Sequence, residues 1–138
     1  MKTTSYIRSE LERLENSANT ALNRIRKSRD LAEVIREMAL PIPPGLRSLR
    51  HTSPAVRRVR IEAQRRAESL VRNQIALLAE IRDEAEFLRT RGALTKEWHR
   101  LNGHFPSLAS LVKVESDRLL NQIRLPYQNT RRDASHSF

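Results

Sequence analysis

The apolar residues near the N-terminus follow one regular spacing, and this spacing restricts the fold more than any other feature of the chain. Steps of 4, 3, 4, 3 and 4 residues separate six of them: Ile7, Leu11, Leu14, Ala18, Ala21 and Ile25. A heptad spacing places side chains on one stripe of an α-helix, whereas a strand would alternate apolar and polar residues. The pattern predicts a long first helix from about residue 4 to residue 39, with a stripe continued by Ala32, Ile35 and Ala39.

One short segment can interrupt this predicted helix. Ser28 falls where the stripe requires an apolar residue, and Asp30 followed by Glu33 has the spacing of a capping pair that restarts a helix. The sequence leaves open whether Ser28–Asp30 kinks the helix or breaks it. Prolines at positions 41, 43 and 44, followed by Gly45, then end the helix because proline cannot continue the backbone hydrogen bonding.

A second long helix is predicted after this proline-rich connection. Ser53 is a good N-cap, and Pro54 suits the first helical position because the N–H that it lacks would have no partner there. We expect the helix to end at about Arg91, with Gly92 as its stop. Its predicted buried stripe comprises Val56, Val59, Ala63, Ala67, Leu70, Leu77, Ile81, Ala85 and Leu88. The two helices predict a long antiparallel hairpin.

The composition indicates an all-α protein that completes its core by association. Aromatic residues make up only 4% of the chain and Gly only 3 of its 138 residues, which argues against a β-sandwich. Because a hydrophobic content of 38% is modest for a monomer, we predict that two hairpins dimerise into a four-helix bundle. The predicted divisions are the hairpin at 1–92, shorter helices at 93–125 (Thr95–Asn102 and Ser107–Ile123, the latter ended by proline), and a flexible tail at 126–138.

Positive charge is concentrated between residues 47 and 72. This window of 26 residues holds eight Arg and two Glu, and therefore +6 of the chain's net +10. At about 100° per residue, Arg58, Arg65 and Arg72 form one ridge opposite the apolar stripe, while Arg60 and Arg66 lie nearer the core edge. In the predicted hairpin a basic group of the first helix lies beside this region: Arg24, Arg26, Lys27 and Arg29.

A concentrated positive field on a helix predicts a surface that binds a polyanion. The basic helix has no aromatic residue before Phe87, whereas single-strand binders interleave aromatic and basic residues. Because no helix-turn-helix or zinc finger is visible, the pattern favours a duplex bound through its backbone, with double-stranded RNA preferred over DNA. The predicted nucleic-acid-binding residues are Arg47, Arg50, Arg57, Arg58, Arg65, Arg72, Arg24 and Lys27.

Other roles of the basic helix stay open. The Arg side chains can keep a helix face soluble, or they can pair across an antiparallel dimer with the acidic residues Glu80, Asp83, Glu84 and Glu86. The main competing function is a helical protein–protein adaptor, such as an anti-defence or scaffold protein, that offers the heptad seam or the basic face to a partner. A basic amphipathic helix on an anionic membrane is a third possibility, which the scarcity of bulky aromatic residues disfavours.

No pattern typical of catalysis or of a metal site occurs in the sequence. His99 and His104 are close but lack the i, i+4 spacing of a helical metal pair, and His51 suits an anion contact. The chain has no Cys, which excludes thiolate metal sites. We therefore expect no enzyme activity, no metal and no cofactor. Trp98 and Phe105 can stack on bases, but packing at the end of a helical bundle is the more common role of such residues.

Two further patterns concern location. No segment approaches the roughly 18 uninterrupted apolar residues of a membrane span. The N-terminal segment lacks the apolar core of a signal peptide and carries acidic residues early. The sequence therefore predicts an intracellular, cytoplasmic protein without a membrane partner.

Two segments resemble a known family. The helix opening YIRSELERLENSANTAL at 6–22, and SPAVRR at 53–58 opening a second long helix that ends at Gly92, look like the small RNA-silencing suppressors of the nodaviruses. The resemblance covers residues 6–92 and implies a dimeric antiparallel four-helix bundle that binds double-stranded RNA along one face and shields it from host RNA interference. It carries Arg57 and Arg58 over as RNA-binding residues. The longer connection between the helices and the helical region after Gly92 depart from the family.

Overall fold

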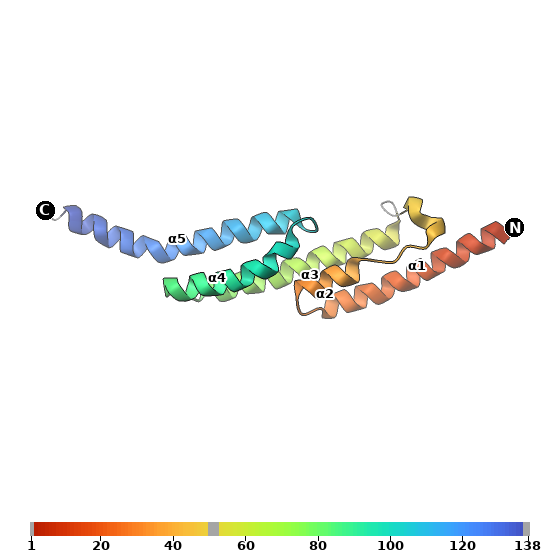
Figure 1. The fold of residues 1–138 in the computed structure, drawn as a ribbon, viewed down its shortest axis with the longest axis horizontal. Coiled ribbons are helices and arrows are strands. Elements are labelled where there is room, and N and C mark those ends of the chain that lie inside the picture. The colour runs from red at the N-terminus through yellow and green to blue at the C-terminus, as the bar shows by residue number, and fades with distance from the viewer. Residues whose placement is uncertain (1, 50–52, 137–138) are drawn as a thin grey trace. The chain divides into compact units, whose positions relative to one another are not determined.

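The computed structural model describes residues 2–49 and 53–136, with side chains placed in 5–48 and 53–125. Every element in the described ranges is helical, which confirms the all-α prediction (Figure 1). The elements are α1 (Lys2–Lys27), α2 (Leu31–Met38), the 3-10 helix η1 (Pro44–Leu49), α3 (Pro54–Ala79), α4 (Glu84–Trp98), the 3-10 helix η2 (His99–Leu101) and α5 (Pro106–His136).

The chain forms two compact units, and the boundary between them lies inside α3. Unit 1 comprises Met1–Ser69 and unit 2 comprises Leu70–Phe138. The predicted boundaries after residues 92 and 125 therefore do not match the compact units. The reason is that both predicted long helices are broken, and each break lets the chain turn back within a few residues.

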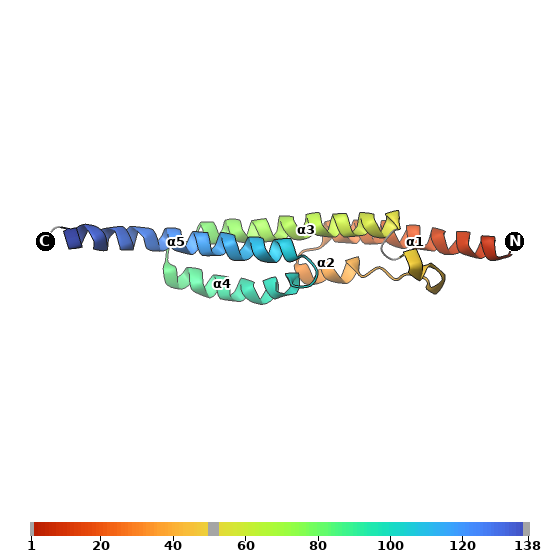
Figure 2. The same cartoon turned by 90° about the horizontal axis from the view of Figure 1, so that it is seen from above.

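Unit 1 contains α1, α2 and the first part of α3. Both views show that α2 runs back beside α1, and that α3 then runs in the same direction as α1 (Figures 1 and 2). Unit 1 is therefore a group of three neighbouring helical segments, not the two antiparallel rods that the sequence predicts. The chain direction reverses at the start of α2, whereas the predicted hairpin reverses it in the proline-rich connection.

The first break occurs at Ser28–Asp30. The Asp30 carboxylate accepts a hydrogen bond from the Glu33 N–H at 2.8 Å, and the Glu33 carboxylate accepts one from the Arg29 N–H, also at 2.8 Å. These two bonds form a variant of the capping box, in which Glu33 accepts from Arg29, the residue before the N-cap, and not from the N-cap Asp30 itself. They satisfy two backbone donors at the start of α2. The predicted capping pair is confirmed, and it breaks the helix instead of kinking it.

The second break, at residues 80–83, contradicts the predicted helix from Pro54 to Arg91. Asp83 is the N-cap of α4, and its carboxylate accepts a hydrogen bond from the Glu86 N–H at 2.9 Å. Gly92 lies inside α4, where a Cβ atom would meet nothing within 4 Å, so it does not stop a helix. The separate short helix predicted at Thr95–Asn102 is wrong, because these residues form the end of α4 and the 3-10 helix η2. Gly103, with a φ of 84°, lies in the turn after η2.

The core of unit 1 follows the predicted stripes near the middle of each helix. Leu14, Ala18, Ala21 and Ile25 of α1 and Val56, Val59, Ala63 and Ala67 of α3 are buried. The stripe is wrong at both ends of the first predicted helix. Ile7 and Leu11 are 44% and 43% exposed, and beyond the capping box the buried residues are Leu31 and Val34 instead of the predicted alanines and Ile35.

In unit 2 the predicted stripe is shifted by one residue. Val71 and Leu78 are fully buried, whereas Leu77 is 61% exposed and Leu70 is half-buried. Each buried residue has an apolar neighbour in sequence, and the predicted stripe chose the wrong member of each pair. After the second break Ala85 and Leu88 are exposed, Ile81 is half-buried, and the remaining core of unit 2 is Phe87, Trp98, Leu101, Phe105, Leu108, Val112, Leu119 and Leu120.

The C-terminal helix is longer than predicted. The sequence predicts a helix over Ser107–Ile123 that Pro126 ends, but the backbone of α5 is helical from Pro106 to His136. Figure 1 shows that α5 is bent. A proline inside a helix removes one hydrogen bond and commonly bends the helix without ending it. The segment after residue 125 is therefore helical in its backbone, contrary to the predicted tail.

Candidate nucleic-acid interface

The two units carry different amounts of positive charge. Residues 1–69 include 15 basic and 8 acidic residues, whereas residues 70–138 include 11 basic and 8 acidic residues. Unit 1 therefore holds most of the chain's net positive charge. Its basic residues come from the C-terminal end of α1 and from α3, and several contacts fix how these two segments lie.

Arg66 joins α3 to the end of α1. Its Nε and Nη2 atoms donate hydrogen bonds to the carbonyl oxygen of Ser28, at 2.9 and 2.6 Å. The last carbonyl groups of a helix lack partners within it, and a cation near this end is favoured by the helix dipole. Arg66 is half-buried, in agreement with its predicted place at the core edge. Its role is structural.

A second contact places the basic end of α1 beside the same turn of α3. The Arg26 Nε donates to the Glu62 carboxylate at 3.0 Å. The predicted neighbourhood of the α1 basic group and the Arg65 region is therefore found, but it arises from two helices that run in the same direction. Lys27 and Arg29 flank Ser28 in sequence, so the Ser28–Arg66 contact brings them near the turn that carries Arg65.

Arg58 does not lie on an outward ridge, which corrects the predicted set of Arg58, Arg65 and Arg72. It forms an ion pair with Glu15 of α1, and the two side chains are 49% and 48% exposed. Arg58, Glu62 and Arg66 are four residues apart and all contact α1, so they mark the side of α3 that faces α1. An exposed pair of this kind contributes only about 0–1 kcal/mol.

The side of α3 that faces solvent in unit 1 carries Arg57, Ile61 and Arg65. The three residues are four apart, and all are exposed, with Ile61 at 48%. In the part of the chain that the structure describes, neither Arg57 nor Arg65 forms an ion pair with a carboxylate. Arg72 is also exposed, seven residues beyond Arg65 and in the portion of α3 that belongs to unit 2.

The other predicted site residues have different surroundings. Arg24 is exposed but lies 3.8 Å from the carboxylate of Glu37 in α2. Lys27 is exposed at the end of α1, and Arg47 is exposed on η1. Arg50 lies outside the described residues.

Several exposed cations of unit 1 have no carboxylate partner among the described side chains. Four of them lie on α3 or at or just after the end of α1, and we call these four the outer basic surface: Lys27, Arg29, Arg57 and Arg65. Arg29 was absent from the predicted binding set. The sequence signal for it is its place close to Lys27, in the basic group at the end of the first predicted helix segment.

The aromatic residues of unit 2 pack in the core. Trp98 and Phe105 are 6% and 2% exposed, as the packing prediction requires. Among the described residues, no three His, Asp or Glu side chains gather closely enough to hold a metal ion. Within the same residues, no helix has the length and apolar character needed to cross a membrane.

Comparison with protein-family models, with curated proteins and with solved structures finds no match to this chain. The resemblance to the nodavirus suppressors therefore stays a prediction. The contacts between α1 and α3 and the four unpaired cations are the features on which a functional proposal can be based.

Proposed function

We propose that this chain binds duplex nucleic acid through its phosphate backbone, with RNA preferred and little sequence specificity, and that it acts by binding and not by catalysis. The observation that carries the proposal is the outer basic surface: Lys27, Arg29, Arg57 and Arg65. Exposed cations without carboxylate partners can exchange their counterions for phosphates, and this exchange supplies most of the affinity in backbone binding.

The absence of aromatic residues from the outer basic surface supports a duplex as the ligand. Single-strand binders stack bases on exposed aromatic rings. Arg57 and Arg65 are eight residues apart on α3, so their roots are about 12 Å apart along the helix axis at about 1.5 Å per residue. This spacing suits contacts with separate phosphates. The preference for RNA rests on the long basic helix and on the resemblance at residues 6–92, and a role in suppressing RNA silencing rests on the resemblance alone.

The proposal includes association of two copies, for which the exposed start of the α1 stripe is the support. Tyr6, Ile7 and Leu11 are 57%, 44% and 43% exposed, and Ile7 and Leu11 continue the stripe that is buried further along α1. Exposed apolar residues that continue a buried stripe of a helix favour association with a partner. A dimer in sedimentation that becomes a monomer in the Leu11→Glu variant is the expected result. A monomeric wild-type protein would contradict this part of the proposal alone.

The test of duplex binding compares two double variants with the same change in charge. Arg57→Gln/Arg65→Gln removes two cations of the outer basic surface, whereas Arg82→Gln/Arg89→Gln removes two exposed Arg of unit 2. We expect the first variant to bind a double-stranded RNA at least about tenfold more weakly, and its salt slope to fall by roughly 2 if each Arg contacts one phosphate. Binding is measured by fluorescence anisotropy at several salt concentrations.

The matched control shows whether duplex affinity depends on the outer basic surface or only on the net charge of the chain. If both double variants lose affinity equally, net charge alone drives binding and the proposed surface is wrong. If the wild-type chain binds neither RNA nor DNA duplexes at low salt, the second candidate function gains support. This candidate is a helical adaptor, favoured by the exposed apolar residues Tyr6, Ile7 and Leu11.

A further inference from the structure

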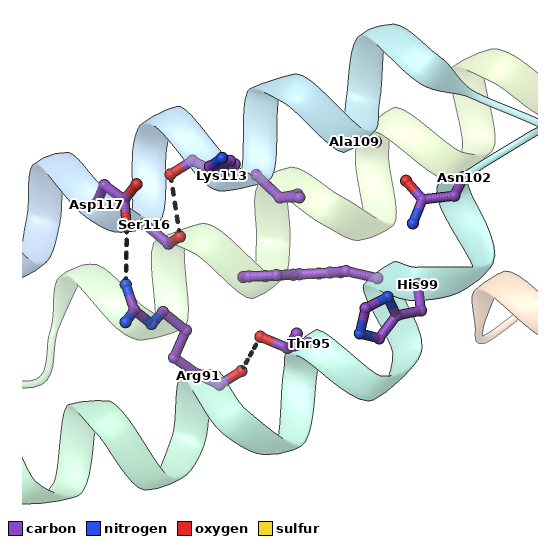
Figure 3. Close-up of a pocket in the computed structure, with 10 residues that line it drawn as sticks. Arg91, Thr95, His99, Asn102, Ala109, Lys113, Ser116 and Asp117 are labelled. Carbon is purple, nitrogen blue, oxygen red and sulfur yellow. Dashed lines mark hydrogen bonds and ion pairs between the residues drawn. The ribbon is translucent and has the colours of Figure 1, made fainter.

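Unit 2 contains a cavity of about 320 Å³ that plays no part in the proposed duplex binding. Figure 3 shows that Arg91 and Thr95 of α4 lie on one wall, that Lys113, Ser116 and Asp117 of α5 lie on the other, and that His99 and Asn102 lie at one end. The volume is at the lower end of the range for small-molecule sites, which is about 300–1,000 Å³. A small organic molecule fits it, and a folded partner does not.

The apolar part of the lining includes a fixed aromatic ring. Trp98 is 6% exposed and lines the cavity together with Ala109 and Val112. Its Nε1 donates a hydrogen bond to the Gln74 side-chain oxygen at 2.7 Å, and the Gln74 amide donates in turn to Glu97 at 2.9 Å. The polar atom of the indole is therefore already satisfied. The part of the indole that lines the cavity can offer only a flat apolar surface, which favours a planar aromatic body.

The polar part of the lining favours an anion. Arg91 and Asp117 form an ion pair at 3.0 Å across the cavity, so their charges offset each other (Figure 3). Lys113 is exposed and has no carboxylate partner among the described residues. The lining therefore has a net charge of +1 when the histidine is neutral. This positive charge attracts a ligand that carries an anionic group.

The remaining polar side chains of the lining divide into two that already donate hydrogen bonds and two that do not. The hydroxyl groups of Thr95 and Ser116 donate to the backbone carbonyls of Arg91 and Lys113, at 2.7 and 3.3 Å. The side chains of His99 and Asn102 form no hydrogen bond within the described part of the chain. Imidazole and amide N–H groups in the same cavity as an ammonium can help to orient the oxygens of a carboxylate or phosphate.

We propose that this cavity binds a small planar aromatic molecule that carries one anionic group. The ring lies against Trp98 between the helices, and the anionic group lies near Lys113, His99 and Asn102. Two sources share this chemistry, an aromatic carboxylate and a nucleoside monophosphate, and the arms of the experiment below separate them. The site lies in unit 2 and does not depend on the outer basic surface of unit 1.

The single tryptophan of the chain provides a direct reporter, because Trp98 is the only residue of its type. The full-length protein is titrated with benzoate and with adenosine 5′-monophosphate, while tryptophan emission is followed under selective excitation. Adenosine, cyclohexanecarboxylate and inorganic phosphate serve as probes that lack either the anion or the aromatic ring. We expect a saturable change with at least one of the two aromatic anions, and a response at least about tenfold weaker with the other three probes.

Three variants test the assignment of residues. Lys113→Gln removes the unpaired cation and should weaken binding about tenfold. Ala109→Leu fills the cavity and should abolish the response. Lys96→Gln changes an exposed lysine of α4 that does not line the cavity, and it should bind as the wild-type chain does. Circular dichroism confirms the fold of each variant.

The outcomes separate clearly. Saturation by benzoate alone identifies a carboxylate ligand, and saturation by the nucleotide alone identifies a mononucleotide. The proposal is overturned if neither anion gives a saturable change, if inorganic phosphate alone gives the same change, or if folded Lys113→Gln binds as tightly as Lys96→Gln. None of these results depends on duplex binding, so failure here and failure of the proposed function can be told apart.

Discussion

The two units share a helix arrangement but differ in their core residues and in the position of their candidate sites. In each, a short helix turns back beside its neighbour after a capping Asp, at Asp30 in unit 1 and at Asp83 in unit 2. Unit 1 buries many small residues and keeps its unpaired cations outside: its buried alanines are Ala18, Ala21, Ala55, Ala63 and Ala67. Unit 2 buries Phe87, Trp98 and Phe105, and its candidate site is an internal cavity.

The difference in core residues indicates which interactions stabilise each unit. A buried alanine removes little apolar surface from water, so an alanine-rich core supplies little hydrophobic free energy per residue. In unit 1, polar contacts between helices such as Arg66 with Ser28 therefore account for a larger share of the stability. In unit 2, three aromatic side chains add a large buried apolar area to the Leu and Val residues of the core. Substitutions should then have different effects in the two units.

The largest effect is expected for Phe87→Ala in unit 2. Phe87 is fully buried, and removal of a buried phenylalanine leaves a cavity that costs about 3–5 kcal/mol of unfolding free energy. Leu88→Ala is the matched control, because Leu88 is the next residue of α4 and is 40% exposed. It should cost less than about 1 kcal/mol. Urea denaturation measures both, and similar losses would show that the aromatic core does not dominate unit 2.

An intermediate effect is expected for Arg66→Ala in unit 1. The guanidinium donates two hydrogen bonds to Ser28, and hydrogen bonds with a charged partner contribute about 1.5–3 kcal/mol. Arg65→Ala removes the same side chain one position earlier, where it is exposed, and should change stability by about 0.5 kcal/mol or less. Duplex affinity should show the opposite order, with the larger loss in Arg65→Ala. Equal stabilities of the two variants would refute the structural role of Arg66.

The smallest effects concern the two capping aspartates. Asp30→Ala and Asp83→Ala each remove a side-chain acceptor for a backbone N–H, which typically costs about 1 kcal/mol. At Asp30 the Glu33 carboxylate adds a second hydrogen bond, from the Arg29 N–H, which depends on the same turn, so we expect the larger loss there. Thermal unfolding followed by circular dichroism measures both. A larger loss at Asp83 would mean that the turn of unit 1 does not depend on its second hydrogen bond.

Much of the fold could be predicted from local signals in the sequence. Ser53 and Pro54 mark the start of α3, and the heptad spacing identifies the buried residues in the middle of α1. Asp83 and Glu86 also have the spacing of a capping pair, but the acidic run that contains them fits the second half of a long helix equally well, so the predicted helix continues through this break. Where two apolar residues are adjacent, as at Leu77 and Leu78, periodicity alone cannot choose between them, and only the position of the neighbouring helix decides.

The position of the Arg cluster could be predicted from the sequence, but the Arg residues that are exposed and unpaired could not all be identified. Counting charges locates the Arg cluster, and a projection of one helix distinguishes Arg66 at the core edge from Arg65 outside. The projection cannot show that α1 lies on the side of α3 that carries Arg58, because that depends on tertiary packing. It also assigns Arg57 a flanking place, although Arg57 is exposed and has no carboxylate partner among the described residues.

The local reversal in each unit also has a consequence for folding kinetics. α2 packs on the helix that precedes it, and α5 packs on α4, its predecessor in the order of α-helices. Closing a short loop costs less chain entropy than closing a long one, and proteins rich in sequence-local contacts fold in about microseconds to milliseconds. We therefore expect this chain to reach its native helices quickly after synthesis, with little time for the exposed apolar start of α1 to meet other unfolded chains.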